Sequence, residues 1–153
     1  MKPSALLPDN RTLYDEDFHL WTQQTAELLR SGHFDLVNIE HLAEEVESMG
    51  ASDRREALSR LRVLLLHLLK WQIQTEYRSR SWSTTIMGQR HDIDTLLEQS
   101  PSIRRLLPQH LEKTYSRAVE DAVNEMGLVA NPFPERCPFS LDEILDSKFL
   151  PEH

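Results

Sequence analysis

The sequence predicts an all-α protein: a compact bundle of five or six helices around a central buried helix at about residues 53–78, with an ordered, proline-rich C-terminal tail. Apolar residues recur at steps of three and four along most of the chain, which is the spacing of one helix face. No stretch of alternating β-branched residues competes with this pattern. The length of 153 residues and a hydrophobic content of 39% suffice for one domain with a buried core. We therefore expect an N-terminal extension, residues 1–12, and a single helical domain, residues 13–151.

The N-terminal third predicts two helices. A first apolar stripe begins at Tyr14 and closes before Gly32, a residue type that often ends helices. Gly50 closes a second stripe, which consists of Leu36, Ile39, Leu42, Ala43, Val46 and Met49. Both stripes are expected to face the core.

The central helix is predicted to start after Ser52, which is a good N-cap residue. Between Val63 and Leu69 this segment is apolar on nearly every side, and His67 is the exception. A helix that is apolar all round usually lies in the middle of a bundle.

Two more long helices follow. The fourth helix is expected to start after Ser81 or Ser83. Ser100-Pro101 combines an N-cap residue with proline at the first helical position and predicts the start of the next helix. Pro108 either breaks or restarts that helix, and a final long segment ends at Gly127.

The proline-rich tail is expected to be ordered coil. Its apolar side chains would each cost about 2 kcal/mol if left in water; they are Phe133, Phe139, Phe149 and Leu150. The sequence from Ser140 to Glu143 fits a capping box and predicts a last short helix, to about Asp146.

Composition limits the cellular setting. No apolar run approaches the roughly 20 residues of a membrane span, and the N-terminus has too short an apolar patch for a secretory signal. The single cysteine, Cys137, cannot form an internal disulfide or a cysteine-based zinc site, and we interpret it as a packed side chain. We therefore expect a soluble cytoplasmic protein that does not associate with membranes.

The net charge of −8 weighs against general nucleic-acid binding, but the charge is unevenly distributed. Residues 1–50 hold 3 basic and 10 acidic side chains, residues 51–120 hold 12 and 8, and residues 121–153 hold 2 and 7. The basic middle either pairs internally with its acidic flanks or attracts an anionic ligand, and internal pairing is favoured.

Several sequence blocks resemble one known family. The blocks are LYDEDFHLW (13–21), LAEEVESMG (42–50), LRVLLLHLLKWQIQTEYRSRSW (61–82), TIMGQR (85–90), SPSIRRLLP (100–108) and FPERCPFSLDEIL (133–145). In order and spacing they resemble the bacterial family called domain of unknown function 29, common in cyanobacteria, over about residues 13–151. Thr75 and Met126 depart from residues frequent in the family. The resemblance implies a small all-α fold and no particular activity.

One polar stripe could carry chemistry. At about 100° per residue, the side chains at four positions of the central helix fall within about 40° of one another; they are Arg60, His67, Gln74 and Arg78. Glu45 lies at the border of the second helix's apolar face, so it is expected to face Arg60, His67 or Lys70 across a helix pair. The favoured interpretation is a buried polar network that fixes helix packing.

The first functional alternative is an anion site at the Arg78–Trp82 turn. A serine cap would leave free N–H groups beside Arg78 and Arg80, and Trp82 could stack on a base. A phosphate, a nucleotide or a nucleic-acid phosphate would suit this cluster. The candidate ligand-binding residues are Arg60, Gln74, Arg78, Arg80, Ser81, Trp82, Gln89 and Arg90.

The second functional alternative is a hydrolase or nuclease-like enzyme. In this hypothesis Glu45 holds His67 in one tautomer, His67 is the general base, and Lys70 or an arginine stabilises an anion. Histidine and carboxylate spacings do not predict a metal site, and no cofactor motif is recognised. The favoured function is therefore a helical interaction or accessory module that binds another protein, ahead of nucleic-acid binding and of an enzyme.

Overall fold

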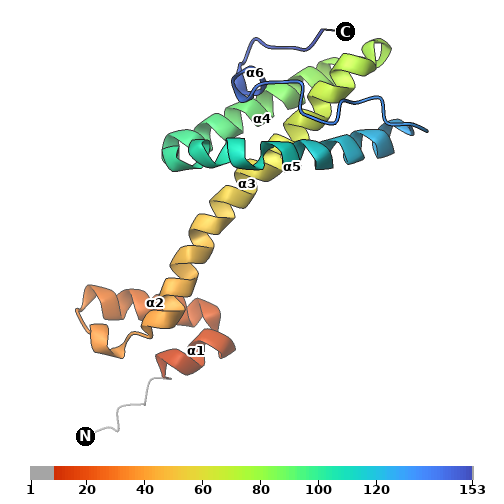
Figure 1. The fold of residues 1–153 in the computed structure, drawn as a ribbon. Coiled ribbons are helices and arrows are strands. Elements are labelled where there is room, and N and C mark those ends of the chain that lie inside the picture. Colours follow the sequence, from red (N-terminus) through yellow and green to blue (C-terminus); the bar gives the residue numbers. More distant parts are fainter. Residues whose placement is uncertain (1–8, 153) are drawn as a thin grey trace, which may run out of the picture. The chain divides into compact units, whose positions relative to one another are not determined.

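The computed structural model describes residues 9–152, which contain six α-helices, two short 3₁₀ helices and no strand (Figure 1). The all-α prediction is confirmed. In chain order the elements are α1 (Asn10–Glu16), α2 (Phe18–Arg30), η1 (Phe34–Leu36), α3 (Ile39–Ile73), η2 (Thr75–Tyr77), α4 (Arg80–Gln99), α5 (Pro101–Met126) and α6 (Leu141–Leu145). Within residues 9–152 no helix is both long and apolar enough to cross a membrane.

Contacts divide the chain into two units, which we call the N-terminal unit, up to Ala51, and the C-terminal unit, from Ser52 onward. Helix α3 contributes its first part to one unit and its second part to the other. The single helical domain over residues 13–151 stays a prediction. Helix α1 begins at Asn10, inside the range expected to be an extension, and residues 1–8 lie outside the described part.

The stripe that predicted one helix from Tyr14 to Leu29 is divided in the structure. Asp17 ends α1 and caps α2, where its carboxylate accepts a hydrogen bond from the backbone N–H of Leu20 at 3.0 Å. Aspartate is one of the strongest N-cap residues, so it can start a new helix inside a periodic pattern. Gly32 follows α2 with a φ of 76°, and the expected stop is confirmed.

The prediction that Gly50 ends a helix is wrong. Helix α3 runs without interruption through Gly50, so the expected second and third helices are one element of 35 residues. Glycine inside a helix costs only about 1 kcal/mol relative to alanine, which flanking turns can offset. The apolar stripe before it is not fully buried either, since Ile39 and Met49 are exposed.

The turn between α3 and α4 is also shifted. Helix α3 ends at Ile73, five residues before the predicted end, and η2 follows. The cap of α4 is Ser79 rather than Ser81 or Ser83, and its hydroxyl accepts a hydrogen bond from the N–H of Trp82 at 3.2 Å.

Helix α5 starts at Pro101, as Ser100-Pro101 predicts, and continues through Pro108. Proline in a helix interior removes one hydrogen bond and costs about 3 kcal/mol. Burial on both sides offsets this cost, because Leu107 and Tyr115 are each 1% exposed. Gly127 ends the helix in the left-handed conformation with a φ of 61°, as expected.

The core of the C-terminal unit forms around the second part of α3, where Leu61, Leu64, Leu65 and Leu68 are fully buried. These leucines belong to one cluster with residues of α4, α5, α6 and the segment that follows α5. Figure 1 shows α3, α4 and α5 crossing in this unit, with α6 close to them. The central position of this part of α3 agrees with its apolar character on all sides.

Hydrogen bonds fix the C-terminal tail to the helices. The Tyr115 hydroxyl donates to the Pro134 carbonyl at 2.7 Å, and Phe133 and Phe139 are buried in the core cluster. The capping box of α6 is present, since Ser140 and Glu143 exchange side-chain to backbone hydrogen bonds. Leu150, in contrast, is 40% exposed.

Candidate functional site

The three candidate catalytic residues belong to two different units. Glu45 and His67 lie on the same helix α3, Glu45 in the N-terminal unit and His67 in the C-terminal unit. His67 Nδ1 is 2.9 Å from the carbonyl oxygen of Val63, one turn earlier on its own helix. Lys70 forms an ion pair with Glu125 of α5 at 2.9 Å. Helix α3 continues through Gly50, where a break between Glu45 and His67 was expected, and the catalytic hypothesis stays a prediction.

The Arg78–Trp82 turn is partly engaged in contacts of its own. Arg78 Nε donates to the Trp71 carbonyl at 2.8 Å, and its guanidinium lies 5.0 Å from the Trp71 ring centroid. Lys70 Nζ lies 4.7 Å from the ring centroid of Trp82. Arg80 and Ser81 are exposed in the first turn of α4. The anion site at this turn stays a prediction.

Of the other candidates, the structure brings Arg60 and Gln89 together. Arg60 bridges α3 and α4, since its Nη1 atom donates to Asp92 at 2.9 Å and to Gln89 at 3.5 Å. The same guanidinium pairs with Glu56 on its own helix. Gln74 lies apart from them, between α3 and η2. These contacts connect α3 to α4, and the single positive charge of Arg60 lies between two carboxylates.

Arg90 has a structural position. It is 3% exposed, and it donates to the carbonyl oxygens of Ile144 and Phe149 at 2.8 Å each. Burial lowers its pKa from the usual value, while Asp146 opposes that shift. Arg90 therefore connects α4 to the C-terminal tail and has no free face for a ligand.

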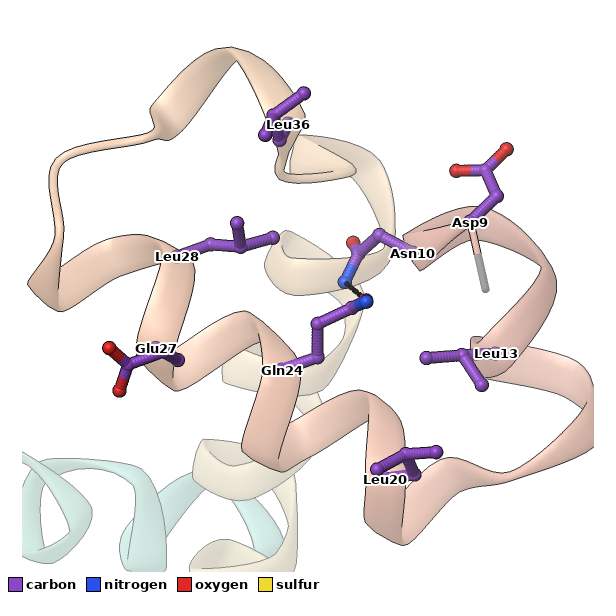
Figure 2. A pocket seen from close by; sticks show the side chains of 8 residues that line it. All are labelled: Asp9, Asn10, Leu13, Leu20, Gln24, Glu27, Leu28 and Leu36. Atoms are coloured by element: carbon purple, nitrogen blue, oxygen red, sulfur yellow. Dashed lines mark hydrogen bonds between the residues drawn. The ribbon is translucent and has the colours of Figure 1, made fainter. Parts of the chain in front are cut away.

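A concave apolar surface lies in the N-terminal unit (Figure 2). This pocket, which we call the leucine pocket, has a volume of about 450 Å³. Figure 2 shows Leu13 of α1 and Leu28 of α2 pointing toward each other across it. The lining residues are Asp9, Asn10, Leu13, Leu20, Gln24, Glu27, Leu28 and Leu36.

One buried amide positions the elements around the leucine pocket. Asn10 is 5% exposed, and its Nδ2 atom donates to Gln24 Oε1 at 3.1 Å and to Thr25 Oγ1 at 2.9 Å. Its Oδ1 atom accepts from the backbone N–H of Asn38 at 3.0 Å. One side chain thereby joins the first turn of α1 to α2 and to the start of α3.

A second contact joins α1 to α3 in the same unit. The Tyr14 hydroxyl donates to Glu45 at 2.6 Å and lies 3.3 Å from Glu44, and its ring stacks on His41 with centroids 3.9 Å apart. The hydrogen bond to Glu45, with smaller contributions from burial and charge, raises the pKa of Tyr14 to about 12. Glu45 is thus bound to a phenol of its own unit, and the phenol stays protonated at neutral pH.

A comparison with protein families gives one match. The model of the family Domain of unknown function DUF29 matches residues 13–150. The chain belongs to this family. No curated protein and no solved structure matched the chain.

The leucine pocket was not predicted from the sequence. Its residues are dispersed, because α1, α2 and η1 each contribute one or two of the leucines. Asp9 caps α1 by accepting a hydrogen bond from the N–H of Arg11 at 3.2 Å. The Asp9-Asn10 pair shortly before Leu13 is therefore the local signal that could have predicted a helix starting at residue 10.

Proposed function

We propose that the protein is a helical interaction module that binds a segment of a partner protein in the leucine pocket of its N-terminal unit. The observation that carries this proposal is an open, apolar depression of about 450 Å³ on a unit that is otherwise strongly acidic. Apolar depressions of this size are the usual places where one anchoring side chain of a partner is buried.

The geometry of the leucine pocket supports recognition of an apolar anchor. Leucine side chains form its walls, whereas Asp9 and Glu27 lie at its rim, and Figure 2 shows both carboxylates pointing away from the centre. An apolar side chain in the centre would be removed from water at about 25 cal/mol per Å² of buried apolar area.

Exposed apolar side chains continue from the pocket over η1 and the start of α3. Phe34, Leu36 and Ile39 are 61%, 57% and 60% exposed. Single exposed apolar residues are common, but a contiguous group beside an apolar depression is typical of a surface that another protein covers. This group would enlarge the contact beyond one anchor.

The charge of the unit indicates the chemistry of the partner. Residues 1–50 hold 10 acidic and 3 basic side chains. The complementary partner is an amphipathic helix with a Leu, Ile or Phe anchor and with Lys or Arg residues beside its apolar face. Association with such a helix would weaken as salt increases, because the flanking charges are at the surface.

The experiment compares proteins captured by the intact chain with those captured by a Leu36→Asp variant. Leu36 is exposed, so a carboxylate there should leave the fold unchanged and oppose an apolar anchor. The matched control is Val129→Asp, which adds the same charge at a fully exposed apolar residue of the C-terminal unit. A true partner is captured by the intact chain and by Val129→Asp, and lost with Leu36→Asp.

A peptide with the sequence of the captured protein's basic amphipathic segment is then synthesised, and its affinity for the chain is measured by calorimetry. We expect Leu36→Asp to weaken it about tenfold or more, corresponding to one lost anchor contact. Equal affinities for Leu36→Asp and Val129→Asp would refute the proposal. Self-association that Leu36→Asp abolishes would assign the pocket to a second copy of the chain instead.

A further inference from the structure

A second concave surface lies between α3 and α5 within the C-terminal unit. This surface, which we call the basic groove, has a volume of about 390 Å³. Helix α3 contributes Arg54, Arg55, Leu58, Ser59 and Arg62, and helix α5 contributes His110, Lys113, Thr114 and Arg117. No carboxylate is among these lining residues, although the described chain is rich in acidic side chains.

One of the basic side chains is already neutralised. Arg62 donates to both carboxylate oxygens of Asp121 on α5, at 2.6 and 2.7 Å. That hydrogen bond is the main reason why the pKa of Asp121 lies below its usual value. The bidentate pair fixes one side of the basic groove and links its two helices.

The other cations of the basic groove have no counter-ion. Within residues 9–152, the side chains of Arg54, Arg55, Lys113 and Arg117 form no ion pair and no hydrogen bond. Four cationic side chains along one concave surface, without a carboxylate between them, repel each other and favour an anion that bridges them. The sequence favours internal pairing of its basic segment with acidic side chains, but these four cations are not paired in that way.

The hydroxyl of a nearly buried threonine also faces the basic groove. Thr114 lines the groove and is 7% exposed as a residue. No described residue hydrogen-bonds its side chain, and the hydroxyl oxygen itself is accessible to solvent. The hydroxyl can donate to a ligand oxygen between the arginines of α3 and the basic residues of α5.

The lining indicates what kind of anion would fit. A single phosphate group carries a charge of about −2 and would leave part of the cationic set unmatched. A volume of 390 Å³ lies in the range of small-ligand sites, roughly 300 to 1,000 Å³. The lining contains no Phe, Tyr or Trp ring for stacking a base, and the net charge of −8 opposes a long polyanion.

We propose that the basic groove binds a small ligand with two or more linked phosphates, held by Arg54, Arg55, Lys113 and Arg117. Free polyphosphate and the phosphate tail of a nucleotide share this chemistry. The Thr114 hydroxyl donates to one phosphate oxygen. The site belongs to the C-terminal unit and is independent of the partner segment proposed for the leucine pocket.

The test measures binding of inorganic triphosphate to the full chain by titration calorimetry at low salt. Arg55→Glu and Lys113→Glu, one on each helix, should each lower the affinity about tenfold or more, since a charge-assisted hydrogen bond is replaced by repulsion. Both residues are exposed, so the fold should be retained. The matched control is Arg80→Glu, the same charge reversal at an exposed arginine of the Arg78–Trp82 turn, which should leave the affinity nearly unchanged.

A second measurement needs no substitution. Backbone NMR signals of Ser59 and Thr114 should shift on addition of triphosphate, whereas those of Arg80 and Ser81 should not. Equal affinities for triphosphate and ATP assign the site to free polyphosphate, and tighter binding of ATP assigns it to a nucleotide.

Three results would overturn the proposal. The first is no binding of triphosphate at millimolar concentration. The second is a loss with Arg80→Glu as large as with Arg55→Glu, which would place the anion at the Arg78–Trp82 turn. The third is tighter binding of a short single-stranded DNA than of triphosphate, which would indicate a nucleic-acid surface.

Discussion

Removal of the Arg90 guanidinium should destabilise the C-terminal unit more than removal of any exposed arginine. Arg90 is 3% exposed and donates to the carbonyl oxygens of Ile144 and Phe149, at 2.8 Å each. These two bonds hold α6 and the chain after it against α4. We consider the substitution Arg90→Ala, which removes both bonds and leaves both carbonyl groups without this partner.

The magnitude follows from the two bonds and the cost of burying the cation. A hydrogen bond to a charged group contributes about 1.5 to 3 kcal/mol. Part of this is offset, because burial lowers the pKa of Arg90 and so disfavours the cation in the fold. We therefore expect Arg90→Ala to lower the free energy of unfolding by about 3 kcal/mol, a large fraction of the 5 to 15 kcal/mol typical of a domain.

The assay is urea unfolding followed by circular dichroism, with Arg104→Ala as the matched control. Arg104 also contacts α6, through Asp142 at 2.7 Å, but the two side chains are 47% and 88% exposed. An exposed pair contributes about 0 to 1 kcal/mol, so this control should change the free energy of unfolding little. Hydrogen exchange of the amides in residues 141–150 should accelerate with Arg90→Ala.

Equal losses of stability for Arg90→Ala and Arg104→Ala would refute this reasoning. Such a result would mean that the free-energy cost of desolvating the buried guanidinium equals the stabilisation from its two hydrogen bonds. Arg90→Lys separates the two effects further, because it keeps the charge but cannot reproduce the two-pronged geometry.

The remaining predictions concern two glycines and one carboxylate. Gly127→Ala should lower the free energy of unfolding by about 1 kcal/mol, because Gly127 has a left-handed backbone with a φ of 61°. Gly88→Ala should raise the free energy of unfolding by about 0.5 to 1 kcal/mol, because Gly88 lies inside α4 with open space around it. Thermal unfolding of both variants measures these changes, and a change of the same sign in both variants would contradict the prediction. The pKa of Asp121 is lowered from 3.8 by its bond to Arg62, so the pair should stabilise the fold above pH of about 4 and lose this contribution as the pH falls further. The free energy of unfolding of Asp121→Asn, measured as a function of pH, should therefore decrease less at acidic pH than that of the unchanged chain. The same decrease in both proteins would argue against a stabilising role of the pair.

Local signals predicted the ends of several helices correctly. Gly32 and Gly127 both adopt the left-handed conformation that ends a helix, and Ser100-Pro101 and the Ser140 capping box start helices where expected. These signals are reliable because one backbone conformation or one side-chain hydrogen bond decides them, and neither depends on distant residues. Gly50 has the same residue type but a helical backbone, and the sequence pattern alone does not distinguish the two cases.

The catalytic hypothesis placed Glu45 opposite His67 on two separate helices. The structure has one continuous helix α3 there, with the two residues in different units, and the hypothesis stays a prediction. The basic groove was missed in a different way. The basic excess of residues 51–120 was visible in the sequence, but which of its cations share one surface was not. Half of the unpaired cations come from α5, at Lys113 and Arg117, more than 50 residues away from Arg54 and Arg55.

The sequence by itself determined that the chain is helical, which stretch of α3 is apolar on all sides, and where strong caps begin and end helices, because these properties depend on spacing within a few turns. Tertiary structure alone decided which charges are paired and which surfaces are concave. Arg62 and Arg90 are basic residues of the same segment as Arg54 and Arg55. The packing of α3 on α5 gives Arg62 a partner, and the packing of α6 and the chain after it on α4 gives Arg90 its partners, whereas Arg54 and Arg55 stay unpaired. Pairing depends on the distance between residues far apart in the chain, and that distance is set by the packing of helices rather than by the pattern within any one of them.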